Sequence, residues 1–176
     1  MARNIEIKAR IGRIEEMEAR VAALADRGPV LLEQDDTFFP CPNGRLKLRV
    51  RSGSDGELIF YRRADHSGAK ESFYLLAKTP KPDALREVLA LAYGTAGHVR
   101  KQRTLYWCGR TRIHLDRVEG LGDFLELEVL LGEEEPPATG EAVARELMER
   151  LGIRAEELID EAYIDLLTPR NSATDE

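Results

Sequence analysis

The stretch RLKLRVR, residues 45–51, alternates basic and aliphatic side chains without interruption. A period of two is typical of a β-strand, whose successive side chains point to opposite faces of a sheet. One face of this strand therefore carries four cations, and the other carries three apolar residues. Like charges placed opposite each other across strands destabilise a sheet. An unbroken basic stripe of this kind is therefore typical of a surface that binds a polyanion.

Similar alternation recurs along the chain. Asn43-Gly44 and the run SGSDG at residues 52–56 are turn signals on either side of the basic stretch, so it should form a hairpin with residues 57–63. The strands expected in total are residues 4–11, 45–51, 57–63, 70–76, 99–108, 111–118 and 124–131.

Four segments instead repeat apolar residues at helical spacing. The first begins near Ile14 and ends before Gly28-Pro29, which stops a helix. The others are expected at residues 83–93, 141–151 and 155–167. Short connections between strands favour antiparallel pairing. The chain is therefore predicted to be α+β, with seven or eight strands, enough to close a barrel.

The amphipathic helices need an apolar surface to cover, and the apolar faces of the strands supply it. Two arrangements remain open for the charged faces. They either look outward from an open sheet or look inward into the lumen of a barrel.

The length and composition limit the class of protein. A chain of 176 residues fits one domain, which we place at residues 1–167, with a flexible C-terminal tail at residues 168–176. With 26 Lys and Arg against 32 Asp and Glu, the net charge of −6 disfavours general nucleic-acid binding. No apolar run approaches the ~20 residues of a membrane span. Two cysteines and no signal peptide favour a cytoplasmic location.

Basic and acidic residues share strand faces in a way that indicates phosphate chemistry. Arginine offers paired donors that fit phosphate oxygens. Carboxylates beside such cations are typical of Mg²⁺ or Mn²⁺ bridging protein and substrate. Glu126 and Glu128 lie on one strand face, roughly 6–7 Å apart. The other candidate oxygen ligands are Glu6 and Asp116.

Four motifs in order carry a resemblance to a known family. NIEIK at residues 4–8, LRVR at 48–51, V-x-K-x-R at 99–103 and the run LDRVEGLGDFLELE at 115–128 resemble the signatures of the CYTH proteins, also called triphosphate tunnel metalloenzymes. The resemblance spans residues 1–167. The segments YRRAD and KESFY, at residues 61–65 and 70–74, are most similar to the class IV adenylyl cyclase branch.

The resemblance implies a closed antiparallel barrel of eight strands with amphipathic helices packed outside. Its lumen would bind a triphosphate on basic residues and Mg²⁺ or Mn²⁺ on carboxylates. The implied phosphate contacts are Lys8, Lys47, Arg49, Arg51, Arg63, Lys70, Lys101, Arg103 and Arg112. The implied metal ligands are Glu6, Asp116, Glu126 and Glu128. The implied catalytic residues are Glu6, Lys8, Glu126 and Glu128.

Two positions depart from the family pattern. Asn4 stands where the signature has its first glutamate, which would weaken metal binding there or remove one of two ions. Tyr61 stands where many members carry a lysine, and Arg63 has the same parity and would replace it. His114 shares the charged face, and we expect it to be a hydrogen-bonded neighbour rather than a catalyst.

Three functions remain open at this point. The first is a metal-dependent enzyme acting on a triphosphate, either a cyclase that converts ATP to cyclic AMP and pyrophosphate or a phosphohydrolase of tripolyphosphate, thiamine triphosphate or a nucleoside triphosphate. The second is a module that binds polyphosphate or nucleotide without turnover, an alternative that rests on Asn4. The third, an RNA-binding sheet, lacks interleaved aromatic residues beyond Tyr61 and Tyr74. The expected partner is therefore a small triphosphate, not a nucleic acid or a membrane, and a homodimer is left open.

Overall fold

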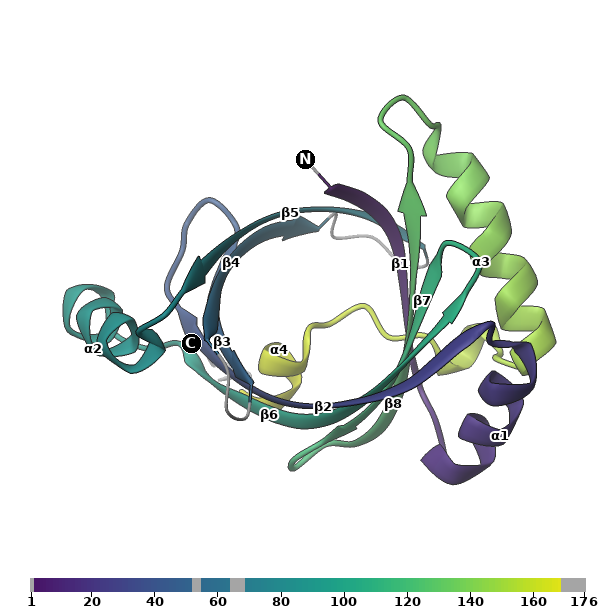
Figure 1. The fold of residues 1–176 in the computed structure, drawn as a ribbon, viewed down its shortest axis with the longest axis horizontal. Helices are drawn as coiled ribbons and strands as arrows, with labels where there is room; N and C mark the ends of the chain where they lie inside the picture. The colour runs from purple at the N-terminus through teal and green to yellow at the C-terminus, as the bar shows by residue number, and fades with distance from the viewer. Residues whose placement is uncertain (1, 52–54, 64–68, 169–176) are drawn as a thin grey trace, which may run out of the picture.

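Eight antiparallel strands close into a single barrel (Figure 1). The structure is a computed structural model and describes residues 2–51, 55–63 and 69–168. In order around the barrel, the strands are β1 (Ala2–Arg10), β5 (Lys70–Thr79), β4 (Gly56–Arg63), β3 (Arg45–Arg51), β2 (Arg27–Phe39), β6 (Gly97–Cys108), β7 (Thr111–Val118) and β8 (Gly122–Leu131). β8 pairs with β1 and completes the ring. The α+β class and the eight-stranded barrel expected from the sequence are confirmed.

β2 is the strand that the sequence analysis missed. Gly28-Pro29, expected only to stop the preceding helix, lies at the start of β2, and the adjacent acids Asp35 and Asp36 interrupt the alternation that would reveal it. β2 pairs with β3 on one side and with β6 on the other. It therefore joins the strands β3–β5 to the strands β6–β8. Closure of the barrel therefore depends on this segment.

The main hydrophobic core lies outside the barrel wall, beneath two helices. α1 (Ile14–Leu24) and α3 (Pro137–Leu151) pack on the same side of the barrel, over β1, β7 and β8 (Figure 1). Gly140 allows α3 to approach closely, because a Cβ atom there would lie 2.6 Å from Ile5 Cγ1 and 2.7 Å from Leu131 Cδ2. The wall residues in this core include Ile5, Ile7, Ile113, Leu115, Leu125, Leu127 and Val129. With the outward faces apolar here, the charged faces must look inward.

The helix expected at residues 155–167 is wrong in its central part. The chain forms a 3₁₀ turn (Ala155–Glu157), runs on in extended form, and ends in a short helix, α4 (Tyr163–Leu167). β1 pairs with β5 only as far as Glu6, and the extended run takes over beyond that point. Leu158 bridges to Ala9, and the Ile159 amide donates to the carbonyl of Lys8 at 2.9 Å. These backbone bonds to β1 replace the bonds of a continuous helix.

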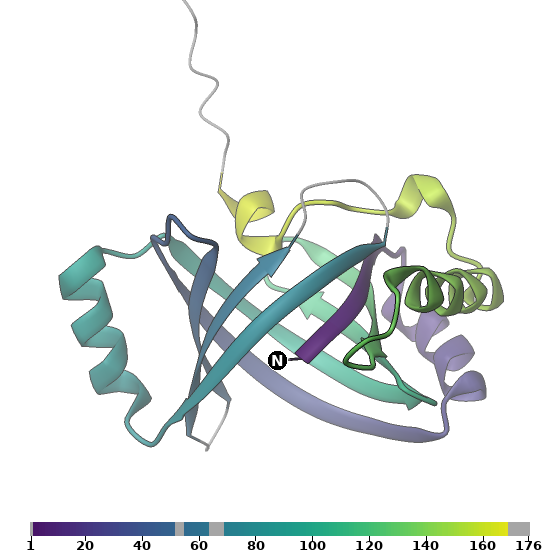
Figure 2. The same ribbon diagram turned by 90° about the horizontal axis from the view of Figure 1, so that it is seen from above.

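α4 covers one end of the barrel, as the two perpendicular views show (Figures 1 and 2). Tyr163 and Ile164 pack there against Phe124 and Val99 in a second, smaller core. The fourth helix, α2 (Pro82–Tyr93), lies on the opposite side from α1 and α3 (Figure 1). The tail expected at residues 168–176 lies outside the described residues after Thr168. Among the described helices, none has the length and apolar content needed to cross a membrane.

Candidate functional site

The barrel encloses a cavity of about 270 Å³ that is lined by charged side chains from the strands. The charged faces therefore look into a lumen, which is the second of the two arrangements that the sequence left open. The cavity brings together ten of the residues expected at the site: Glu6, Lys8, Lys47, Arg49, Arg51, Lys101, Arg103, Arg112, Glu126 and Glu128. These residues come from β1, from β3 and from the consecutive strands β6, β7 and β8, three regions that lie far apart in the sequence.

The described cavity lining does not include the other three expected residues, and of these only the side chain of Asp116 is described. The backbones of Arg63 and Lys70 belong to β4 and β5, but their side chains lie outside the part of the chain that the structure describes. Asp116 is fully buried beneath the basic residues of β6 and is absent from the described cavity lining. Asn4 does line the cavity and is 3% exposed.

Asp36 on β2 forms a tight cluster with two lumen cations. Arg49 donates to it through two nitrogens, each at 2.7 Å, and the Lys47 ammonium lies 2.8 Å from Oδ2. Burial alone would raise the pKa of Asp36, but the charges of Arg49 and Lys47 hold it well below its usual range. Burial and the nearby Arg49 lower the pKa of Lys47 to about 8. The sequence analysis missed Asp36 because it did not recognise β2.

A second cluster surrounds Arg103 on β6. Its guanidinium donates to both oxygens of Asp116 at 2.6 Å and to Glu126 at 2.5 Å, and Lys101 lies 2.6 Å from Asp116. Burial would raise the pKa of Asp116, but Arg103 and Lys101 hold it below its usual range. Burial opposes the charge of Glu126 as well, and Arg103 and Lys8 hold its pKa well below normal. Both carboxylates are therefore anionic at neutral pH.

Tyr163 on α4 closes this part of the cavity. Its hydroxyl donates to Asp116 at 3.0 Å, and the ammonium groups of Lys8 and Lys101 lie 4.1 and 4.8 Å from its ring centroid. Burial and the nearby Glu126 raise the pKa of Tyr163 well above its usual value. The sequence offered no signal for Tyr163, because its role depends on the extended run that brings α4 across the barrel end.

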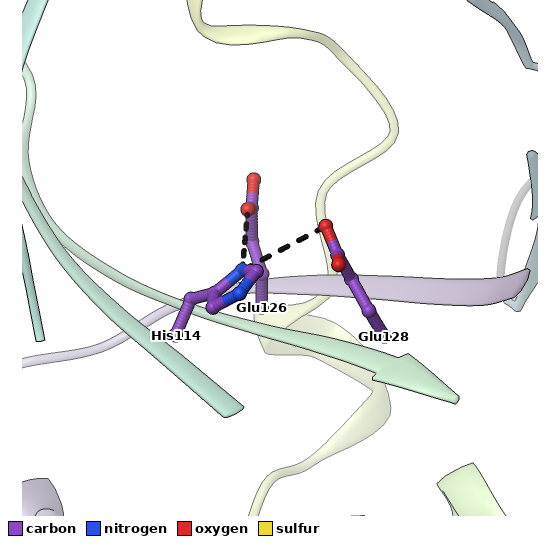
Figure 3. Close-up of side chains that lie close together, drawn as sticks. All are labelled: His114, Glu126 and Glu128. Carbon is purple, nitrogen blue, oxygen red and sulfur yellow. Dashed lines mark ion pairs between the residues drawn. The ribbon is translucent and has the colours of Figure 1, made fainter. Parts of the chain in front are cut away.

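His114 and two glutamates converge on the lumen side of β7 and β8 (Figure 3). One ligand atom of His114, one of Glu126 and one of Glu128 all lie within 4.8 Å of one another. His114 and Glu126 are buried, and Glu128 is partly buried. An imidazole and two carboxylates form a donor set that fits a divalent cation. Glu6 lines the same cavity but is not among the described residues that converge in this way.

Comparison with known proteins agrees with this geometry. The model of the CYTH domain family matches residues 2–163, nearly the whole chain. This chain belongs to the CYTH domain family. The CYTH resemblance drawn from the sequence motifs is therefore confirmed.

Relatives of this CYTH protein carry several names. It is 24% identical over 167 residues to adenylate cyclase CyaB of Aeromonas hydrophila, and the aligned region covers 86% of this chain and 83% of the relative. The solved structure of PH1012 from Pyrococcus horikoshii is 26% identical, with a TM-score of 0.84, covering 93% of this chain and 98% of that one. HpAC1 from Hippeastrum, described as having a dominant triphosphatase activity, shares the fold at 15% identity, with a TM-score of 0.65 and coverage of 92% and 91%.

The basic residues in this CYTH lumen already have carboxylate partners in the protein. Asp36 forms ion pairs with the basic residues of β3, and Asp116 and Glu126 form ion pairs with those of β6. Glu57 lies 2.8 Å from Arg51. The basic stripe of residues 45–51 is thus partly neutralised from within the barrel. A polyanion that enters the lumen would compete with these carboxylates for the cations, most directly with Asp36 for Lys47 and Arg49.

Replacement of Asp36 tests this competition. We expect Asp36→Asn to lower the free energy of unfolding by about 3–5 kcal/mol, because it leaves the buried Arg49 and the partly buried Lys47 without their anion. The same change should tighten tripolyphosphate binding, because the phosphates no longer compete with a carboxylate. Chemical denaturation and titration calorimetry measure the two effects.

Asp35→Asn is the matched control on the opposite face of β2, where Asp35 is half-buried and faces Arg100 and His98. It should change stability by less than about 1 kcal/mol and leave binding unchanged. Weaker tripolyphosphate binding in Asp36→Asn would show that Asp36 positions the cations rather than competing with the ligand.

Proposed function

We propose that this CYTH protein binds the triphosphate of a small substrate in its lumen and converts ATP to cyclic AMP and pyrophosphate with the aid of a divalent metal ion. The observation that carries the proposal is the barrel lumen, whose wall carries Arg49, Lys101 and Arg103 together with Glu126 and Glu128. The resemblance to the A. hydrophila adenylate cyclase supports the choice of reaction.

The basic residues hold the substrate in this proposal. Lys8, Lys47, Arg49, Arg51, Lys101 and Arg103 donate charge-assisted hydrogen bonds to the phosphate oxygens, and we assign Arg63, Lys70 and Arg112 to further contacts. Asp116 keeps Arg103 and Lys101 oriented through the contacts described above. Because phosphoryl transfer depends on positioning and on neutralising charge, such fixed donors supply much of what the reaction needs.

The carboxylates hold the metal. Glu126 and Glu128 are its proposed ligands, with Glu6 at the wall of the same cavity. When bound, a divalent ion neutralises charge that develops on the attacked phosphorus and on the leaving oxygens. The carboxylates suit this task because the cations around Glu126 and Glu128 keep the pKa of each below its usual range.

In the cyclase reaction, the ribose 3′-oxygen forms a bond to the α-phosphorus, the bond from that phosphorus to pyrophosphate breaks, and the hydroxyl proton is released. In this proposal, the lumen residues fix the position of the phosphate chain, so that the α-phosphorus of ATP lies beside Glu126 and Glu128. The position of the phosphate chain along the lumen therefore decides which phosphorus reacts.

Hydrolysis of the terminal phosphate is the second candidate, and the position of Tyr163 favours it. Tyr163 closes the barrel end beside Lys8, which itself lies 3.3 Å from Glu126. A phosphate chain that enters from the other end would bring its terminal phosphorus to these acids first. Water would then attack the terminal phosphorus and release orthophosphate.

Product analysis separates these readings. The protein is incubated with Mg²⁺ or Mn²⁺ and with ATP, tripolyphosphate or thiamine triphosphate, and the products are identified. Cyclic AMP with pyrophosphate supports the cyclase, whereas orthophosphate supports the hydrolase. Tight triphosphate binding without turnover would contradict both and support a binding module.

Lys47 should make triphosphate binding dependent on pH. Its pKa of about 8 in the free protein means that it is charged below that pH and becomes neutral above it. We expect tripolyphosphate affinity to fall roughly tenfold between about pH 7.5 and 9.5, since one charge-assisted contact is lost. In Lys47→Arg, which stays charged, the fall should be clearly smaller than in the wild type, as calorimetry across this range would measure; burial and the nearby Arg103 also lower the pKa of Lys101, which accounts for a remaining dependence. Identical pH profiles in the two proteins would assign the dependence to another group.

A further inference from the structure

The Nδ1 atom of His114 is buried without a hydrogen-bond partner among the described residues. The residue is 4% exposed and lines the lumen cavity. Its neighbours are Glu126 Oε2 at 3.6 Å and Glu128 Oε1 at 3.7 Å, and both distances are too long for hydrogen bonds. Buried polar atoms in proteins nearly always have a partner. The expectation that His114 is a hydrogen-bonded neighbour does not hold for this nitrogen.

The two carboxylates are held in place by other groups and still have free capacity. Glu128 uses Oε2 to pair with Arg112 at 2.9 Å, while its Oε1 faces His114. Glu126 pairs with Lys8 through Oε1 and with Arg103 through Oε2. A carboxylate offers about four lone-pair sites, so each glutamate still has lone pairs that can bind a further cation.

The spacing suits one ion. Two ligand atoms bound to the same ion at about 2.1 Å lie at most about 4.2 Å apart. Both distances from Nδ1 fall within this limit. The three ligand atoms all lie within 4.8 Å of one another, so only a small approach of the glutamates is needed for all three to bind one ion. His114 lies opposite Glu126 in the pairing of β7 with β8, so the barrel wall itself fixes the arrangement in Figure 3.

We propose that His114 Nδ1 is a nitrogen ligand of the lumen metal, together with Glu126 and Glu128, and that the site therefore prefers Mn²⁺ or a similar transition-metal ion to Mg²⁺. Mg²⁺ takes oxygen ligands and loses its water reluctantly. Imidazole suits transition-metal ions, above all Zn²⁺, Fe²⁺ and Ni²⁺, and Mn²⁺, at the weak end of that series, still accepts nitrogen more readily than Mg²⁺ does. The proposal deepens the proposed function by naming the ion, and it rests on that function only for the role of the metal in turnover.

Electron spin-echo spectroscopy of Mn²⁺ bound to the whole protein without triphosphate tests the ligand directly. We expect coupling to a ¹⁴N nucleus, which changes to the ¹⁵N pattern when histidine is labelled. His114→Gln should abolish the coupling and weaken Mn²⁺ binding roughly tenfold or more, while Mg²⁺ binding changes much less. His98→Gln is the matched control, because His98 is 48% exposed and faces Asp35 outside the lumen. It should retain both the coupling and the affinity.

Absence of nitrogen coupling in wild-type protein with Mn²⁺ bound would overturn the proposal. So would equal losses of Mg²⁺ and Mn²⁺ affinity in His114→Gln. Either result would favour an imidazolium that is ion-paired with both glutamates. These readouts need no substrate, so they separate the two proposals. Nitrogen coupling without turnover would contradict only the proposed enzymatic function. Metal-dependent turnover without nitrogen coupling would contradict only the proposal that His114 is a metal ligand.

Discussion

Glu126→Gln should lose about 10²- to 10⁴-fold in metal-dependent turnover while the barrel still folds. A bound divalent ion contributes several kcal/mol to charge stabilisation in a transition state, and a neutral amide holds that ion far less well than a carboxylate. The cost to folding should be smaller, about 1–3 kcal/mol. Arg103 keeps both of its bonds to Asp116, and Lys8 keeps the carbonyl of Glu161.

Steady-state assays with Mn²⁺ and each triphosphate, together with chemical denaturation, measure the two effects of Glu126→Gln. Glu149→Gln on the outer surface of α3 is the matched control, because Glu149 is exposed and far from the lumen. It should behave as the wild type in both assays. Full activity in Glu126→Gln would show that the metal assignment is wrong.

Arg103→Met should weaken tripolyphosphate binding about 100-fold. Arg103 offers a planar pair of donors to the lumen, and two charge-assisted hydrogen bonds are together worth about 3 kcal/mol or more. The same change should lower the free energy of unfolding by about 3–5 kcal/mol, because Asp116 and Glu126 lose the buried cation that they share. Calorimetry at a temperature where the variant is folded measures the binding.

Arg100→Met is the matched control for Arg103→Met. Arg100 lies on the same strand but on its outer face, with its side chain 63% exposed and 3.2 Å from Asp35. It should keep wild-type affinity and lose less than about 1 kcal/mol of stability. Arg103→Lys keeps the charge but loses the planar pair of donors. Its tripolyphosphate affinity should lie between those of Arg103→Met and Arg100→Met. Equal affinities in Arg103→Met and Arg100→Met would place the ligand outside the lumen.

The parts of the site that the sequence predicted share one property. Arg49 and Glu126 each lie on a strand whose charged and apolar residues alternate, so the face that they occupy can be read from residue order. Lys101 lies on a strand that is polar on both faces over residues 100–103, and there only its shared parity with Arg103 points to the lumen. Residue order alone did not distinguish an outward from an inward direction. The apolar outer wall beneath α1 and α3 decides this, and it depends on contacts between segments far apart in the chain.

The parts that the sequence did not predict depend on such long-range contacts. Asp36 follows another acid, and its role appears only when β2 is paired with β3 on one side and β6 on the other. Tyr163 follows a segment with helical spacing that is instead held extended along β1. The expected ligand role of Asp116 remains a prediction, since the structure describes it as the partner of Lys101, Arg103 and Tyr163.

A crystal structure of the protein with tripolyphosphate and Mn²⁺ would test the central claim most directly. We predict phosphate density inside the barrel, in contact with Arg49 and Arg103, and an anomalous manganese peak beside Glu126 and Glu128. Asp36 should then have given up at least one of its two cations to the ligand. Phosphate bound on the outer surface, with Asp36 still paired to both Lys47 and Arg49, would contradict the account.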